Sequence, residues 1–164
     1  MNIFSHVAVV LLIYASPSFA SEPIPAAQII WKEHFGQSRA DTNTLFCLMA
    51  QGGFRADTTN VQSVATAWLK AHPKALVVTV LSHTPLLTGQ PSSRFAYVWI
   101  VQGSDNMNVE MVRQGCFAPA TQMLMEGDKP SIPQQDYDAF LQKVAAAGKR
   151  AKKVKAGIWE HASK

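Results

Sequence analysis

The last part of the chain carries the pattern that most restricts its fold. Between residues 137 and 154, apolar side chains recur every three or four positions, which is the period of a helix with one buried face. They are Tyr137, Phe140, Leu141, Val144, Ala147, Ala151 and Val154. We expect Gly157 to end this helix and Ile158-Trp159 to fold back onto its last turn. Such a helix must cover an apolar surface formed by the rest of the chain.

Two apolar segments predict that surface. Residues 76–81 (LVVTVL) and 94–101 (RFAYVWIV) are rich in β-branched and aromatic residues, which is typical of buried strands. Shorter runs at 27–32, 44–50 and 54–55 are compatible with strands, although 44–50 also fits a helix. We therefore expect several short strands, separated by turn residues, in one sheet.

Two further helices are expected before the last one. Residues 61–71 have helical apolar spacing and stop before Pro73. Residues 107–114 form the other, with Asn106 as N-cap and Gly115 as its stop. A chain of 164 residues with 48% apolar residues is one ordered domain by size and composition. The sequence predicts an α+β fold, a small barrel with about three helices packed on it.

The first twenty residues resemble a secretory signal peptide. The apolar run at 7–14 is too short to span a bilayer, and Ser18-Phe19-Ala20 places small residues where a signal peptidase reads them. Residues 1–6 contain no Lys or Arg, so a buried core segment is the alternative. We expect cleavage after Ala20, leaving one domain at 21–164. The product is then a periplasmic or secreted protein, with no stable membrane insertion.

The net charge of +4 comes from one segment. Six of the 15 basic residues lie between 143 and 155, and the other nine are outnumbered by 11 acidic residues. The bases fall off the apolar stripe of the last helix, so a solvated face is one interpretation. Contact with the phosphates of a polyanion is the other. The candidate polyanion-binding residues are Lys149, Arg150, Lys152 and Lys153.

Export also bears on the two cysteines. Cys47 and Cys116 are the only cysteines, and a pair in an oxidising compartment is commonly bridged. A disulfide between them is therefore predicted, with two separate buried thiols as the alternative. Neither cysteine has a second Cys or a His at metal-ligand spacing.

Three ordered segments resemble the staphylococcal-nuclease-like (thermonuclease) family. Residues 94–99 (RFAYVW) are similar to its R-x-x-A-Y-[VI]-[YW] strand, with one residue fewer between Arg and Ala. Residues 108–115 (NVEMVRQG) resemble its N-x-x-L-V-R-x-G helix, and residues 151–159 resemble its A-x-x-x-x-x-G-[IL]-W ending. The resemblance implies a five-stranded OB-fold-like barrel.

The same resemblance implies phosphodiester hydrolysis of DNA or RNA, with a calcium ion held by Asp carboxylates, a Glu as general base and two Arg on the phosphoryl oxygens. Carried over, Asp41 and Asp57 become candidate metal ligands, and Arg55 and Arg94 candidate catalytic residues. The Glu position is occupied by Asn60, whose carboxamide cannot accept a proton near neutral pH.

Three functions follow as hypotheses. The first is an exported, divergent metal-dependent nuclease with a rearranged calcium site. The second is a non-catalytic OB-fold module that binds nucleic acid, another polyanion or a protein partner, as Asn60 favours. The third is a structural scaffold, since a fold does not fix a function. A catalytic interpretation requires the four candidate side chains to converge on one patch.

Overall fold

The computed structural model describes residues 22–32, 35–49, 51–56, 58–83, 94–119 and 129–160. The predicted signal peptide at 1–20 lies outside these ranges, as does the candidate ligand Asp57. The strands are β1 (Ile24–Pro25), β2 (Ile29–Lys32), β3 (Phe35–Ser38), β4 (Thr44–Leu48), β5 (Gln51–Ala56), β6 (Leu76–His83), β7 (Arg94–Gln102), β8 (Asp105–Asn106) and β9 (Phe117–Pro119). The helices are α1 (Thr58–Ala71), α2 (Met107–Arg113) and α3 (Gln134–Lys153), with single 3₁₀ turns η1 (Ala26–Gln28) and η2 (Gly157–Trp159).

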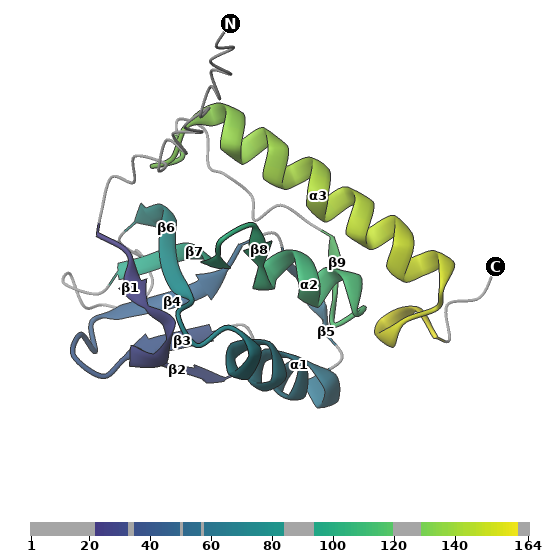
Figure 1. Ribbon diagram of the computed structural model, residues 1–164, viewed down its shortest axis with the longest axis horizontal. Coiled ribbons are helices and arrows are strands. Elements are labelled where there is room, and N and C mark those ends of the chain that lie inside the picture. Colours follow the sequence, from purple (N-terminus) through teal and green to yellow (C-terminus); the bar gives the residue numbers. More distant parts are fainter. Residues whose placement is uncertain are drawn as a thin grey trace, which may run out of the picture.

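The strands form a curled sheet, with the helices around it (Figure 1). Six strands follow the order β1-β6-β7-β4-β3-β2, and β8 adds to β7. The pair β4–β7 is parallel, with Thr44 opposite Arg94 and Leu48 opposite Val98. The other strand pairs of the sheet are antiparallel. The α+β class and the three helices are thus confirmed, on a sheet curled into half a barrel.

The strand count differs from the predicted five. In the described residues the curled sheet has seven strands, and β5 and β9 form a separate pair. Most of the extra strands are very short: β1 and β8 have two residues each and β9 has three. The strand β3 reads FGQS, which has no apolar run. Such strands exist because neighbouring strands pair with them, and a local sequence pattern does not reveal that pairing.

Both faces of the central strands are buried, and each face packs against a different helix. One cluster joins Phe46, Leu48, Val98 and Ile100 of the sheet to α1, including Trp68. The other cluster lies on the opposite face. It joins Val78, Val80 and Trp99 of the sheet to Tyr137, Phe140, Val144 and Ala147 of α3. Figure 1 shows α1 and α3 on opposite sides of the sheet, so the predicted role of the last helix is confirmed.

The last helix ends two residues earlier than expected. Lys155 adopts a left-handed conformation with φ of 54°. The Lys155 amide donates to the carbonyl of Lys152 and the Ala156 amide to that of Ala151, which is a Schellman motif. The residue that reverses the chain is therefore Lys155, not Gly157. As expected, Trp159 folds back onto the last turn, where Lys152 Nζ lies 4.5 Å from the centre of its ring.

Candidate functional site

The candidate residues Asp41 and Arg94 lie together at the amino ends of the parallel strands β4 and β7, which we call the amino end of this pair. Asp41 precedes β4 by three residues, and Arg94 is the first residue of β7. The Arg94 amide donates to the carbonyl of Asn43 at 2.9 Å. The fold therefore brings together one candidate metal ligand and one candidate catalytic residue from distant parts of the sequence.

The Asp41 carboxylate stabilises the turn that leads into β4. Its Oδ1 accepts a hydrogen bond from the Asn43 amide at 2.9 Å, and its Oδ2 accepts one from the Thr44 hydroxyl at 2.6 Å. These bonds lower the pKa of Asp41, the Thr44 hydroxyl having the largest effect and the positive charge of Arg94 a smaller one. Both carboxylate oxygens thus have a structural role in the turn.

Arg55 and Asp57 are not brought to the amino end by any described contact. Arg55 lies in β5, which begins two residues after Met49, beyond the carboxyl end of β4. The strand β5 pairs with β9, which follows α2. The Arg55 side chain and all of Asp57 lie outside the part of the chain that the structure describes. Of the four candidates, the structure brings together two.

The position expected for a general base is part of a helix. Asn60 lies in the first turn of α1, and its side-chain oxygen accepts a hydrogen bond from the Ser63 hydroxyl at 3.2 Å. The Ser63 hydroxyl also lies 2.9 Å from the carbonyl oxygen of Asn60. These bonds between residues one helical turn apart place Asn60 in the local structure of α1.

The described residues include only one of the two candidate calcium ligands, Asp41. No group of three or more His, Cys, Asp or Glu side chains lies together in the part of the chain that the structure describes. Calcium takes six to eight oxygen ligands, whereas Asp41 contributes one carboxylate that already accepts two hydrogen bonds. Calcium binding accordingly stays a prediction that depends on Asp57.

The carboxyl end of the β4–β7 pair is held by Asn108, the first residue of the family-like helix motif. Asn108 is fully buried. Its Oδ1 accepts a hydrogen bond from the Ile100 amide, and its Nδ2 donates to the carbonyls of Met49 and Val98. One side chain therefore joins α2 to the end of β4 and to the part of β7 where the parallel pairing stops. The sequence indicated that Asn108 mattered to the motif but not that its role is structural.

Two glycines of the family-like motifs pack against each other. Gly115 and Gly157 both have positive φ, 71° and 52°. A Cβ on Gly115 would overlap the carbonyl of Ala156, and one on Gly157 would overlap the carbonyl of Gly115. The Ile158 amide donates to the Gly115 carbonyl at 3.0 Å. This close approach, which we call the glycine contact, ties the segment after α3 to the end of α2.

The two cysteines are buried on different faces of the sheet, and the structure has no disulfide between them. Cys116 belongs to the cluster that contains Phe46 and Leu48. Cys47 lies between those two residues in β4, so its side chain points to the other face. This arrangement corresponds to the alternative of two buried thiols. Burial raises the pKa of Cys47 to about 12, so its thiol is not an activated nucleophile.

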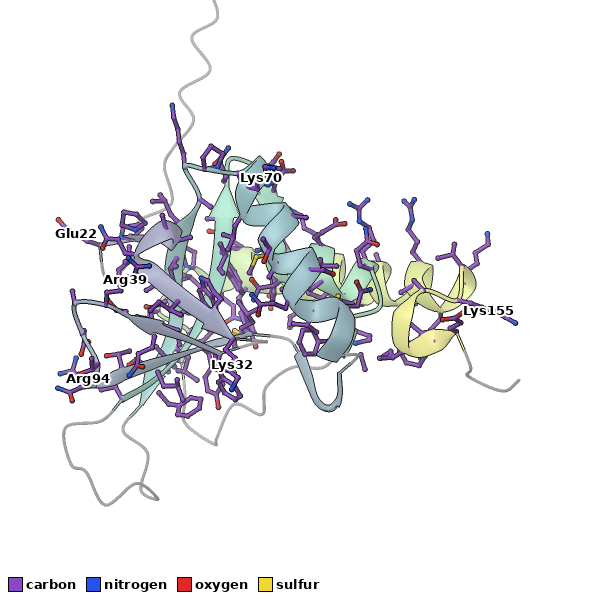
Figure 2. The ribbon with its side chains drawn as sticks, turned by 90° about the horizontal axis from the view of Figure 1, so that it is seen from below. Glu22, Lys32, Arg39, Lys70, Arg94 and Lys155 are labelled. Carbon is purple, nitrogen blue, oxygen red and sulfur yellow. The ribbon has the colours of Figure 1, made fainter. Side chains whose placement is uncertain are left out.

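The predicted polyanion-binding residues all lie exposed near the end of α3. Lys149, Arg150, Lys152 and Lys153 are on the side opposite the buried stripe, and we call these four the cationic face. Within the described part of the chain, none of them has an acidic group within 4 Å. Figure 2 shows Lys155, just past this face, and Arg94 at opposite ends of the molecule. The cationic face is therefore far from the amino end.

Another cluster of side chains, apart from the amino end and the cationic face, is centred on His72. The spacing of histidines along the sequence does not predict this cluster. His72 follows α1, stacks on Trp68 with ring centres 3.9 Å apart, and places Nε2 3.2 Å from Asp105 Oδ2. Trp68 and His72 are four residues apart, the spacing of neighbours on a helix, and this was the available signal. Asp105 comes from β8, which is distant in the sequence, so its contact with His72 could not be assigned from the sequence.

Comparison with protein-family models gives no match, and comparison with curated proteins gives none either. No helix in the described ranges is both long and apolar enough to cross a membrane. The fold and the site define an α+β protein with a half-barrel sheet, a buried asparagine, Asn108, that links α2 to β4 and β7, and a separate cationic face.

Proposed function

We propose that this chain is an exported, divergent member of the staphylococcal-nuclease-like family, with an OB-fold-like barrel, that binds DNA or RNA without cleaving it. The proposal includes removal of residues 1–20 as a signal peptide. The observation that carries it is the cationic face of α3, because its four exposed bases have no acidic partner within 4 Å in the described ranges. Unpaired surface cations are the groups that neutralise phosphates and release counterions.

The shape of α3 supports this assignment. Its bases follow each other within two turns and lie on the side away from the sheet, so a phosphate backbone can approach without displacing any element of the fold. Lys152 is additionally positioned over Trp159, a contact that holds the cation near the surface. The acidic residues of α3, Asp136 and Asp138, lie near its other end and do not oppose binding there.

Three findings favour binding over catalysis. Asp41 uses both carboxylate oxygens in the turn before β4. Asn60 replaces the general base and bonds within α1, and loss of a general base typically lowers a rate ~10²–10⁴-fold. The strand of Arg55, β5, follows the carboxyl end of β4, whereas Arg94 begins β7 and lies opposite Thr44 at the amino end of the β4–β7 pair.

The test is the salt dependence of affinity for labelled single-stranded DNA and RNA, measured by fluorescence anisotropy. Replacing all four bases of the cationic face by Gln should reduce the slope of log K against log salt by up to about 3. The matched control replaces Lys32, Arg39, Lys70 and Lys129, which are exposed elsewhere, and should change the slope much less. Equal slopes for the two variants would place the binding site away from α3.

A second candidate function rests on the proximity of Asp41 and Arg94. If the amino end retains phosphodiester hydrolysis, cleavage of DNA or RNA requires calcium, stops with chelator, and is lost in Arg94→Ala. Gel analysis of both substrates at high protein concentration measures this directly. We expect no calcium-dependent cleavage, and its appearance together with loss in Arg94→Ala would establish the nuclease instead.

A further inference from the structure

A groove between α1 and α2 lies apart from both regions described above. Its volume is about 800 Å³, within the range of small-ligand sites. Apolar walls come from Val64, Ala67 and Val109, and polar groups include His72 with Asp105 and Arg113 with Glu110. Lys143 of α3 also lines it. Three elements that are far apart in the sequence thus contribute to one concave surface.

The His72 ring is held in one orientation. It stacks on Trp68 with an angle of 14° between the ring planes. Its Nδ1 lies 2.8 Å from the Trp68 carbonyl oxygen, which can only accept, so Nδ1 carries a proton. Its Nε2 faces Asp105 at 3.2 Å. His72 is half-buried and lines the groove, so its ring is held in orientation before any ligand arrives.

One cation of the groove has no acidic partner among the described residues, although Asp105 and Glu110 balance Arg113 and Lys143 in formal charge. Asp105 faces His72, and the Glu110 carboxylate accepts hydrogen bonds from Arg113 and Gln114. Lys143 has no acidic group within 4 Å among the described residues and is exposed. The groove therefore offers an aromatic surface for stacking and, on α3, an unpaired ammonium group for an anion.

We propose that this groove binds one nucleotide unit, with its base stacked on His72 and its phosphate at Lys143. Bases stack on histidine as on other aromatic side chains, and a lysine ammonium is a common phosphate partner. The inference deepens the proposed nucleic-acid binding and rests on it. The unit belongs either to a free nucleotide or to a strand that also contacts the cationic face, and the chemistry in the groove is the same.

The experiment is calorimetric titration of the full chain with adenosine 5′-monophosphate and with ribose 5-phosphate, which has the phosphate but no base. We expect the nucleotide to bind at least about tenfold more tightly, since stacking of one base contributes about that much or more. His72→Ala should abolish this advantage, and Lys143→Gln should weaken both ligands. Lys32→Gln, an exposed lysine on β2, is the control and should change neither.

Two results would overturn the proposal. One is equal affinity for adenosine 5′-monophosphate and ribose 5-phosphate, and the other is unchanged nucleotide binding in both His72→Ala and Lys143→Gln. Circular dichroism checks that His72→Ala is folded, and Lys143→Gln changes only an exposed side chain. A short oligonucleotide that binds more tightly than the mononucleotide, and loses that gain when the cationic face is replaced, identifies a strand as the source. Failure of the cationic-face test with retained mononucleotide binding refutes only the proposed function.

Discussion

The two ends of the parallel pair β4–β7 carry family-like residues that have different structural roles. At the amino end, Asp41 and Arg94 are exposed, and Asp41 is occupied by local hydrogen bonds in a turn. At the carboxyl end, Asn108 is fully buried and hydrogen-bonds to the backbone of Met49, Val98 and Ile100, and the glycine contact follows the other end of α2. The motif residues whose contacts the structure describes are thus mainly those that hold the fold together.

The buried and the exposed residues of these motifs are therefore constrained in different ways. A buried side chain that links backbone segments, such as Asn108, can be replaced by few residue types because packing and hydrogen bonding restrict it. An exposed carboxylate such as Asp41 can be replaced with little effect on folding, even where function changes. Substitutions at the two ends test this contrast, and the most destabilising ones come first.

Asn108→Ala should have the largest effect. It removes the partner of the Ile100 amide and of the Met49 and Val98 carbonyls, so the free energy of unfolding should fall by about 3–5 kcal/mol. Urea denaturation followed by circular dichroism measures this. The neighbouring control is Asn106→Ala, which removes one N-cap bond to Val109 and should cost about 1 kcal/mol. Similar losses of stability in the two variants would contradict the role of Asn108 in linking α2 to β4 and β7.

Gly115→Ala should cause the second-largest loss of stability. It forces an L side chain into positive φ and also into the carbonyl of Ala156, and we expect a loss of about 2–4 kcal/mol in urea denaturation. Gly103→Ala is the matched control, because Gly103 has φ of 59° but a Cβ added to it would meet nothing within 4 Å. That variant should lose only about 1 kcal/mol. Equal losses of stability in the two variants would mean that Gly115 is required only for its positive φ and not for its close approach to Ala156.

Asp41→Ala should have a small effect that depends on pH. Because folding lowers the pKa of Asp41, its stabilisation is present above about pH 4 and is lost as the pH falls through its lower folded value. We expect a loss of about 0.5 kcal/mol at neutral pH that disappears toward low pH, measured by thermal unfolding across this range. A difference from the native chain that stays constant with pH would show that the charge of Asp41 is unimportant for the turn.

A substitution at the end of α3 should instead give a small gain in stability. Lys155 holds a left-handed conformation at the end of α3, which glycine adopts with less strain. Lys155→Gly should therefore raise the free energy of unfolding by about 0.5 kcal/mol, again measured in urea. Lys153→Gly, within the last turn of α3, is the contrasting variant and should lower it by a similar amount. A loss in both would contradict the Schellman assignment.

The parts of the fold predicted from sequence are those determined locally. The period of apolar residues identified α3, and Asn106 identified the start of α2, where its side chain accepts a hydrogen bond from the Val109 amide. The polar strand β3 was missed, because its existence depends on pairing with β2 and β4. For the site, the sequence suggested Asp41 and Arg94 individually, but their proximity depends on the parallel β4–β7 register, which no local pattern contains.

The glycine contact also governs how α3 can come away from the sheet. Gly115 and Gly157 lie on either side of the segment that contains β9 and α3, so their contact closes that segment into a loop. Fraying of α3 from its basic end must first break the bond from the Ile158 amide to the Gly115 carbonyl. Exchange of the Ile158 amide hydrogen therefore reports this opening directly. The cationic face lies at the same end of the helix, so the charges move as one body with α2 until that bond opens.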